Sequence, residues 1–176
     1  MLPMIPNQMP LPLAKFLVLA CMSLQLVLGS CKHEVDGAPF DAQLFQDAVA
    51  GGSVYYVGTP TITGGAGNSP HGFMRIRFDS IAYAALDTTG VLPIDQLFPN
   101  GSIIVKEVYT SATGSLDHYT VMKKDLGSPV EGSGWVWGEY LPDGTVKYSA
   151  LERGAACISC HSQAPNRDLV RAFDLH

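Results

Sequence analysis

Five residues near the C-terminus, Cys157-Ile158-Ser159-Cys160-His161, constrain the fold of this chain more than any other feature. They match the C-x-x-C-H pattern, in which two thiols can form thioethers with the vinyl groups of a haem and the adjacent imidazole can ligate its iron. We therefore expect one covalent haem c, attached through Cys157 and Cys160 and ligated by His161. The domain must then be large enough to bury a core around that haem.

Two other chemistries use the same residue types. A zinc site needs about four protein ligands, but no second cluster with metal-ligand spacing exists among the other histidines, which are His33, His71, His118 and His176. A thioredoxin-like pair of cysteines lies at a strand-to-helix junction in a βαβ unit, and no such alternation precedes Cys157. The sequence favours haem over both.

The N-terminus has the features of an export signal. Lys15 precedes an apolar stretch, residues 16–28, which is too short and too interrupted for a permanent membrane-spanning helix. The next residues, Leu28-Gly29-Ser30-Cys31, resemble the bacterial lipobox, whose cysteine becomes a lipidated N-terminus. The alternative is an ordinary cleavage site beside a coincidental cysteine. We expect a lipoprotein on the periplasmic face of a bacterial membrane, or a soluble periplasmic protein if the lipobox is not used.

These features predict a signal peptide over residues 1–30, lipidation of Cys31, a tether over 31–38 and one haem c domain over 39–176. The four cysteines are then all assigned, because one leaves with the leader, one is acylated and two bind haem. The net charge is −5 and no basic run is present, so nucleic acid is not an expected partner.

Hydrophobic periodicity predicts an α+β fold in which the haem packs against an antiparallel sheet. Short helices are expected over residues 40–50 and 81–86, the second capped by Asp79 or Ser80. A flexible loop is expected through the glycines at 64–67. Strands are expected over residues 54–57, 73–78, 102–109, 119–123, 134–140 and 145–148. The segment that carries the haem motif would then cover the sheet as a lid.

Three stretches together resemble the cytochrome P-460 family, whose relatives include the beta-type cytochromes c-prime. They are residues 98–107, then 134–138 followed by 142–144, and finally the haem motif with Asp168 downstream. The resemblance implies an antiparallel sheet, a homodimer and a single haem with an open distal position. Name-giving members oxidise hydroxylamine and carry a lysine joined covalently to the porphyrin, which Lys106 matches here. The c-prime-like relatives lack this cross-link and bind gases such as nitric oxide in an apolar pocket.

The strand around Lys106 has two apolar faces. Lys106 shares one face with Ile104 and Val108, whereas Glu107 shares the other with Val105. Either charge is out of place unless it is paired, solvated or functional. Lys106 could extend from a sheet edge into water, but the resemblance favours a side chain that faces the haem.

The resemblance therefore implies an exported haem c protein that oxidises or binds small nitrogen compounds, such as hydroxylamine or nitric oxide, at an open iron. The enzyme hypothesis is a haem-dependent hydroxylamine oxidoreductase that passes electrons to a partner cytochrome. The alternatives are a gas-binding protein with a free Lys106, and a simple electron-transfer cytochrome. Oxidation also needs a proton acceptor, and four residues are suitable by type, although the sequence does not show which of them faces the haem: Glu107, Glu131, Glu139 and His118.

Three other residues have simpler interpretations. His71 lies in a turn signal, where we interpret it as an exposed or hydrogen-bonded loop histidine rather than a second iron ligand, so the iron stays open. Trp135 and Trp137 alternate along a strand and are expected to pack in the core or at the haem edge.

Overall fold

A computed structural model describes residues 35–174, except for residues 51, 57 and 68. The predicted signal peptide, Cys31 and the first half of the predicted tether lie outside these residues. Among the helices of the described part of the chain, none is both long and apolar enough to cross a membrane.

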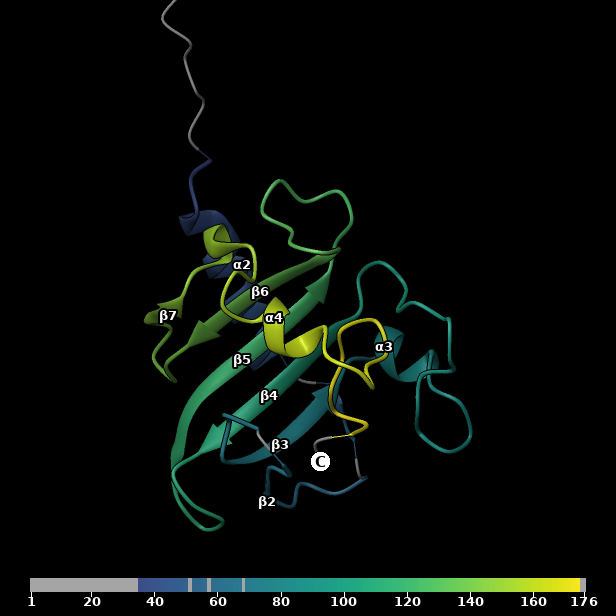
Figure 1. Ribbon diagram of the computed structural model, residues 1–176. Coiled ribbons are helices and arrows are strands. Elements are labelled where there is room, and N and C mark those ends of the chain that lie inside the picture. The colour runs from purple at the N-terminus through teal and green to yellow at the C-terminus, as the bar shows by residue number, and fades with distance from the viewer. Residues whose placement is uncertain (1–34, 51, 57, 68, 175–176) are drawn as a thin grey trace, which may run out of the picture. The chain divides into compact units, whose positions relative to one another are not determined.

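An antiparallel sheet of seven strands dominates the fold (Figure 1). Its strand order is β1-β3-β4-β5-β6-β7, and β2 also pairs with β3. With a few short helices, this sheet confirms the predicted α+β class. The strands are β1 Val54–Tyr55, β2 Thr63–Gly64, β3 Phe73–Phe78, β4 Ile103–Tyr109, β5 Leu116–Lys124, β6 Trp135–Tyr140 and β7 Val146–Tyr148.

Alternation along the long strands gives the sheet two apolar faces. The register of β4 and β5 aligns Ile104 with Met122 and Val105 with Val121, so each face continues from strand to strand. One face belongs to a cluster that also contains Trp137, and the other belongs to a separate cluster around Val105 and Val121. A layer can therefore pack on each side of the sheet.

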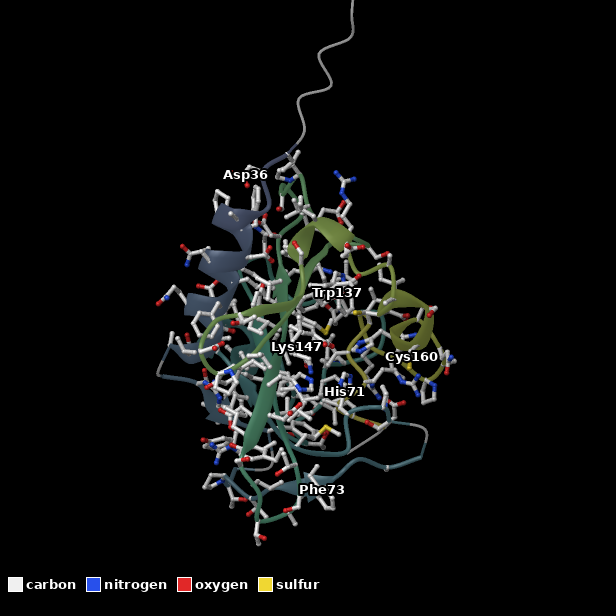
Figure 2. The ribbon with its side chains drawn as sticks, turned by 90° about the vertical axis from the view of Figure 1, so that its left-hand side faces the viewer. Asp36, His71, Phe73, Trp137, Lys147 and Cys160 are labelled. Carbon is white, nitrogen blue, oxygen red and sulfur yellow. The ribbon has the colours of Figure 1, made fainter. Side chains whose placement is uncertain are left out.

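Helix α2, Ala38–Val49, covers the face that carries Val105 and Val121 (Figure 2). Proline in the first turn suits a helix start, and Leu44 and Ala48 are buried at helical spacing. The buried Asp41 carboxylate accepts hydrogen bonds from the Tyr140 hydroxyl, the Ser149 hydroxyl and the Ala150 amide, over 2.7–3.0 Å. These bonds attach the helix to β6 and to the turn after β7.

The short helix α4, Ile158–His161, lies over the opposite face of the sheet (Figures 1 and 2). It follows the 3-10 helix η1, Ala150–Glu152, and is a single turn long. The remaining helix, α3, spans Ser80–Ala84, and the Asp79 carboxylate caps it by accepting from the Ala82 amide. The haem motif therefore forms the expected lid.

Most predicted elements occur within a few residues of their expected bounds, with three differences. Helix α2 begins at Ala38, two residues early and inside the predicted tether. The predicted flexible loop overlaps at Gly64 with the unpredicted strand β2, where Thr63 pairs with Met74 and Gly64 with Phe73. Strand β5 begins at Leu116, because its pairing with β4 continues past the predicted start.

Candidate haem site

The thiols of the haem motif lie half-buried on one turn of α4. Cys157 and Cys160 are both free, and burial raises the pKa of the Cys157 thiol to about 11. Gly154 brings the chain close to the sheet before the helix starts. Its φ is +71°, and a Cβ there would lie 2.6 Å from the ring of Trp137. Both sulfur atoms remain available for thioether bonds.

His161 is arranged as a metal ligand. Its Nδ1 donates a hydrogen bond to the Leu169 carbonyl oxygen, 2.7 Å away, which leaves the lone pair of Nε2 free. Burial lowers the pKa of His161 to about 4, so the ring is neutral at neutral pH. The ring stands edge-on to Trp137, with 5.1 Å between centroids. A neutral, oriented imidazole is the form that ligates iron.

A cavity of about 390 Å³ lies between α4 and the sheet. The motif residues border it from one side, and four apolar side chains border it from the sheet, namely Ile76, Ile104, Met122 and Trp137. Two thiols, a neutral imidazole and an apolar wall are the groups that a covalent haem requires. The residues present therefore fit haem.

Lys106 faces this cavity, on the side of the sheet that the family resemblance favours, together with Ile104. Its ammonium makes no hydrogen bond or ion pair within the described residues, and burial lowers the pKa of Lys106 to about 8. The alternative, a lysine extending from a sheet edge, is wrong, because β4 is an interior strand paired with both β3 and β5. A larger share of this amine is neutral at neutral pH than for an exposed lysine.

Among the polar side chains that border the cavity with Lys106, three form a cluster, namely His71, His118 and Glu139. They come from three different segments, and one ligand atom of each lies within 4.8 Å of the others. The Asp117 carboxylate orients the His118 ring, because one of its oxygen atoms lies 2.5 Å from Nδ1 of His118. This cluster can accept or donate protons beside a bound ligand.

The expectation that His71 is an exposed or hydrogen-bonded loop histidine is wrong. The residue does lie in a turn, but its half-buried side chain lines the cavity near Lys106 (Figure 2). Burial, followed by the charge of Lys106, lowers the pKa of His71 to about 3. Local turn chemistry could not reveal this, because the contact depends on how the turn folds over the sheet.

The four candidate proton acceptors separate into two groups. His118 and Glu139 border the cavity. Glu107 lies on the other face of the sheet, where it pairs with Arg75 and Arg77.

The fourth candidate, Glu131, accepts a hydrogen bond from the Gly134 amide at 2.5 Å and does not border the cavity. A sequence signal for Glu139 was present, because it alternates with Trp135 and Trp137 and so shares their face of β6. Of the four candidates, His118 and Glu139 are therefore the two that border the cavity. Trp135 and Trp137 themselves are buried, as expected.

A buried ion pair near α4 was missed by the sequence reasoning. Lys124, at the end of β5, pairs with Asp168, and only 3% and 5% of their side chains are exposed. Asp168 had been noted as part of the family resemblance without a role. No sequence pattern predicts an ion pair between two residues so far apart in the chain. The alternation of a β-strand predicts the face on which Lys124 lies, but it does not identify Asp168 as its partner.

Fold and site together define a haem protein built on an antiparallel sheet. The sequence profile of the Cytochrome P460 family matches residues 55–171, which is more than half of the chain, and the chain therefore belongs to that family. The match includes Lys106 and the whole haem motif. Among curated proteins, no similar sequence was found.

Proposed function

We propose that this protein is an exported cytochrome with one covalent haem c that oxidises hydroxylamine, or a similarly small nitrogen compound, at an open iron position. Thioethers at Cys157 and Cys160 and ligation by His161 would hold the haem. When bound, the haem would supply the metal that binds the substrate nitrogen and accepts its electrons. The electrons would then leave to a partner cytochrome.

The observation that carries this proposal is the position of Lys106 in the same cavity as the motif. Its lowered pKa, about 8, makes the amine a better nucleophile near neutral pH than an ordinary lysine. A bond from Nζ to a porphyrin carbon would replace one N–H and one C–H bond, and its formation would need a two-electron oxidant such as a peroxide. This bond would distort the macrocycle and change its electronics. The polar cluster beside Lys106 also favours catalysis over gas binding in an apolar pocket.

Oxidation of hydroxylamine releases protons together with electrons, so the cavity needs an acceptor. Glu139 faces the cavity without an ion pair among the described residues. His118 is held by Asp117 and borders the same space. We assign proton acceptance to these two residues, and their arrangement supports a substrate that loses protons.

Turnover by the purified, haem-loaded protein tests the proposal, with a soluble electron acceptor in place of the partner cytochrome. Lys106→Ala should lower hydroxylamine oxidation by roughly 100-fold or more while haem stays attached. Lys123→Ala is the matched control, because Lys123 lies on the adjacent strand and pairs with Asp47 instead. Unchanged turnover in Lys106→Ala would contradict the assigned role.

The ligation state of the iron distinguishes the remaining alternatives. A high-spin spectrum is expected, because an open position is needed for substrate. A low-spin spectrum that His71→Ala converts to high-spin would instead identify His71 as a second ligand and favour electron transfer. Nitric oxide binding without hydroxylamine turnover would favour a gas-binding protein.

Export and anchoring form the last part of the proposal. Removal of residues 1–30 and acylation of Cys31 would attach the domain to the periplasmic face of a bacterial membrane through lipid. Haem attachment to C-x-x-C-H outside the cytoplasm supports this assignment. Cys31→Ser should release the haem-loaded protein into the soluble periplasmic fraction, and continued membrane association of that variant would contradict it.

A further inference from the structure

Lys124 and Asp168 form a closely fitted buried ion pair. The Lys124 ammonium lies 2.7 Å and 2.9 Å from the two carboxylate oxygens of Asp168, and 4.9 Å from the ring centroid of Trp135. Both side chains are almost fully buried. A buried ion pair is often no more stabilising than an apolar pair of similar volume. Stabilisation of the fold alone therefore does not explain the presence of this ion pair.

The backbone at Asp168 has an unfavourable conformation. Asp168 and Leu169 both have left-handed φ values, +51° and +65°, which residues with a Cβ rarely adopt. Such conformations persist where surrounding contacts impose them. Backbone hydrogen bonds between Arg167 and Val170 close this turn. The Asp168 carboxylate anchors it to the rest of the domain, because it binds Lys124 and also accepts a hydrogen bond from the Phe98 amide at 2.8 Å.

This imposed turn directs one carbonyl group at the haem motif. The Leu169 carbonyl oxygen lies 2.7 Å from Nδ1 of His161. Two residues later, Arg171 donates a hydrogen bond to the Cys160 carbonyl oxygen at 2.9 Å. The segment after the motif thus holds α4 at two points, namely His161 and Cys160. The ion pair fixes the contact with His161.

We infer that Lys124 and Asp168 are positioning residues that tune the haem iron by fixing the carbonyl group that accepts the His161 hydrogen bond. A hydrogen bond at Nδ1 makes Nε2 a stronger electron donor. Stronger donation stabilises ferric iron and lowers the midpoint potential. Loss of the ion pair frees the turn, weakens this hydrogen bond and raises the potential. The inference rests on haem ligation by His161, and not on the identity of the substrate.

A second ion pair serves as a matched control. Lys123, the preceding residue on β5, pairs with Asp47 of α2 at 2.8 Å. Because consecutive residues of a strand point to opposite faces, this pair lies on the α2 side of the sheet. Like the Lys124–Asp168 pair, the Lys123–Asp47 pair joins a lysine of β5 to a carboxylate that is distant in sequence. Unlike that pair, it does not contact the segment that holds α4.

The experiment measures the midpoint potential and the iron–histidine stretching band of the haem-loaded protein. Asp168→Asn and Lys124→Met should each shift the potential in the positive direction and the band to lower frequency. Asp47→Asn and Lys123→Met should leave both unchanged, even where they lower the melting temperature. An unchanged potential and band in Asp168→Asn, or equal shifts in the control variants, would overturn the inference.

A variant that lacks both the Lys124 and the Asp168 charge controls for misfolding of the single variants. Lys124→Met combined with Asp168→Asn leaves no unpaired buried charge and keeps a side chain that tolerates the left-handed φ. It should show the same two shifts, whereas wild-type values would overturn the inference. Haem content and ligation are measured first in the wild type. If His161 does not ligate haem, both the inference and the proposed function fail. Unchanged spectra in a haem-loaded variant overturn the inference alone.

Discussion

Two adjacent residues of β4, Lys106 and Glu107, lie on opposite faces of the sheet and differ in how their charges are paired. On the face covered by α2, Glu107 lies between Arg75 and Arg77, so a buried acid and two bases are paired. On the cavity face, Lys106 and Glu139 have no ion-pair partner among the described residues. Lys106 and Glu107 are therefore adjacent on β4 but lie in different electrostatic environments. Glu107 is held in an ion-pair network that stabilises the fold, whereas a buried, unpaired lysine with a lowered pKa, such as Lys106, marks a functional site.

The largest expected effect concerns the lid of the cavity face. A Cys157→Ser, Cys160→Ser variant should lose all covalently attached haem, because no thiol remains for thioether formation. Haem staining of a denaturing gel measures this directly. Cys31→Ser should keep its haem and serves as the control. Covalent haem in the double variant would show that the motif is not the attachment site.

Two glutamates test the contrast between the faces. Glu139→Gln should lower hydroxylamine turnover by roughly 10²–10⁴-fold, the usual contribution of a general base, with little change in stability. Steady-state kinetics and urea unfolding of the haem-loaded protein measure the two effects. Normal turnover in this variant would remove Glu139 from the proposed role.

The same substitution on the other face should have the reverse effect. Glu107→Gln leaves Arg77 buried without its carboxylate, so the free energy of unfolding should fall by about 3 kcal/mol. Turnover per haem should stay close to the wild-type value. If Glu107→Gln impaired catalysis as strongly as Glu139→Gln, the division between the two faces would be wrong.

The smallest expected effect is a pH dependence caused by His71. Its pKa falls from 6.5 to about 3 on folding, so the unfolded chain binds one more proton between these values. Stability should therefore decrease as pH falls below 6.5, by about 1–2 kcal/mol between pH 7 and pH 5. His71→Gln should remove this part of the decrease in urea unfolding. An identical slope in both proteins would contradict the burial of His71.

Local patterns in the sequence were sufficient for much of this structure. The haem motif pointed to residues that do border the cavity, and strand alternation placed Lys106 and Glu107 on opposite faces, because the side-chain direction of a strand follows from its period of two. The capping of α3 by Asp79 also follows from local chemistry.

Contacts that depend on tertiary folding were not accessible in this way. The turn with His71 folds over the sheet, and Asp168 reaches Lys124 across the domain, so neither contact leaves a local pattern. Strand β2 was missed because its glycine-rich sequence has low β-propensity, and pairing with β3 overrides that preference.

The most direct test of the cavity site is tandem mass spectrometry of haem peptides from a tryptic digest of the purified protein. If Lys106 is joined to the haem, trypsin cannot cleave after it. Residues 78–123 should then appear as one peptide, linked through haem to residues 154–167, with two hydrogen atoms fewer than the sum of the parts. Haem carried by residues 154–167 alone, with normal cleavage after Lys106, would contradict the cross-link.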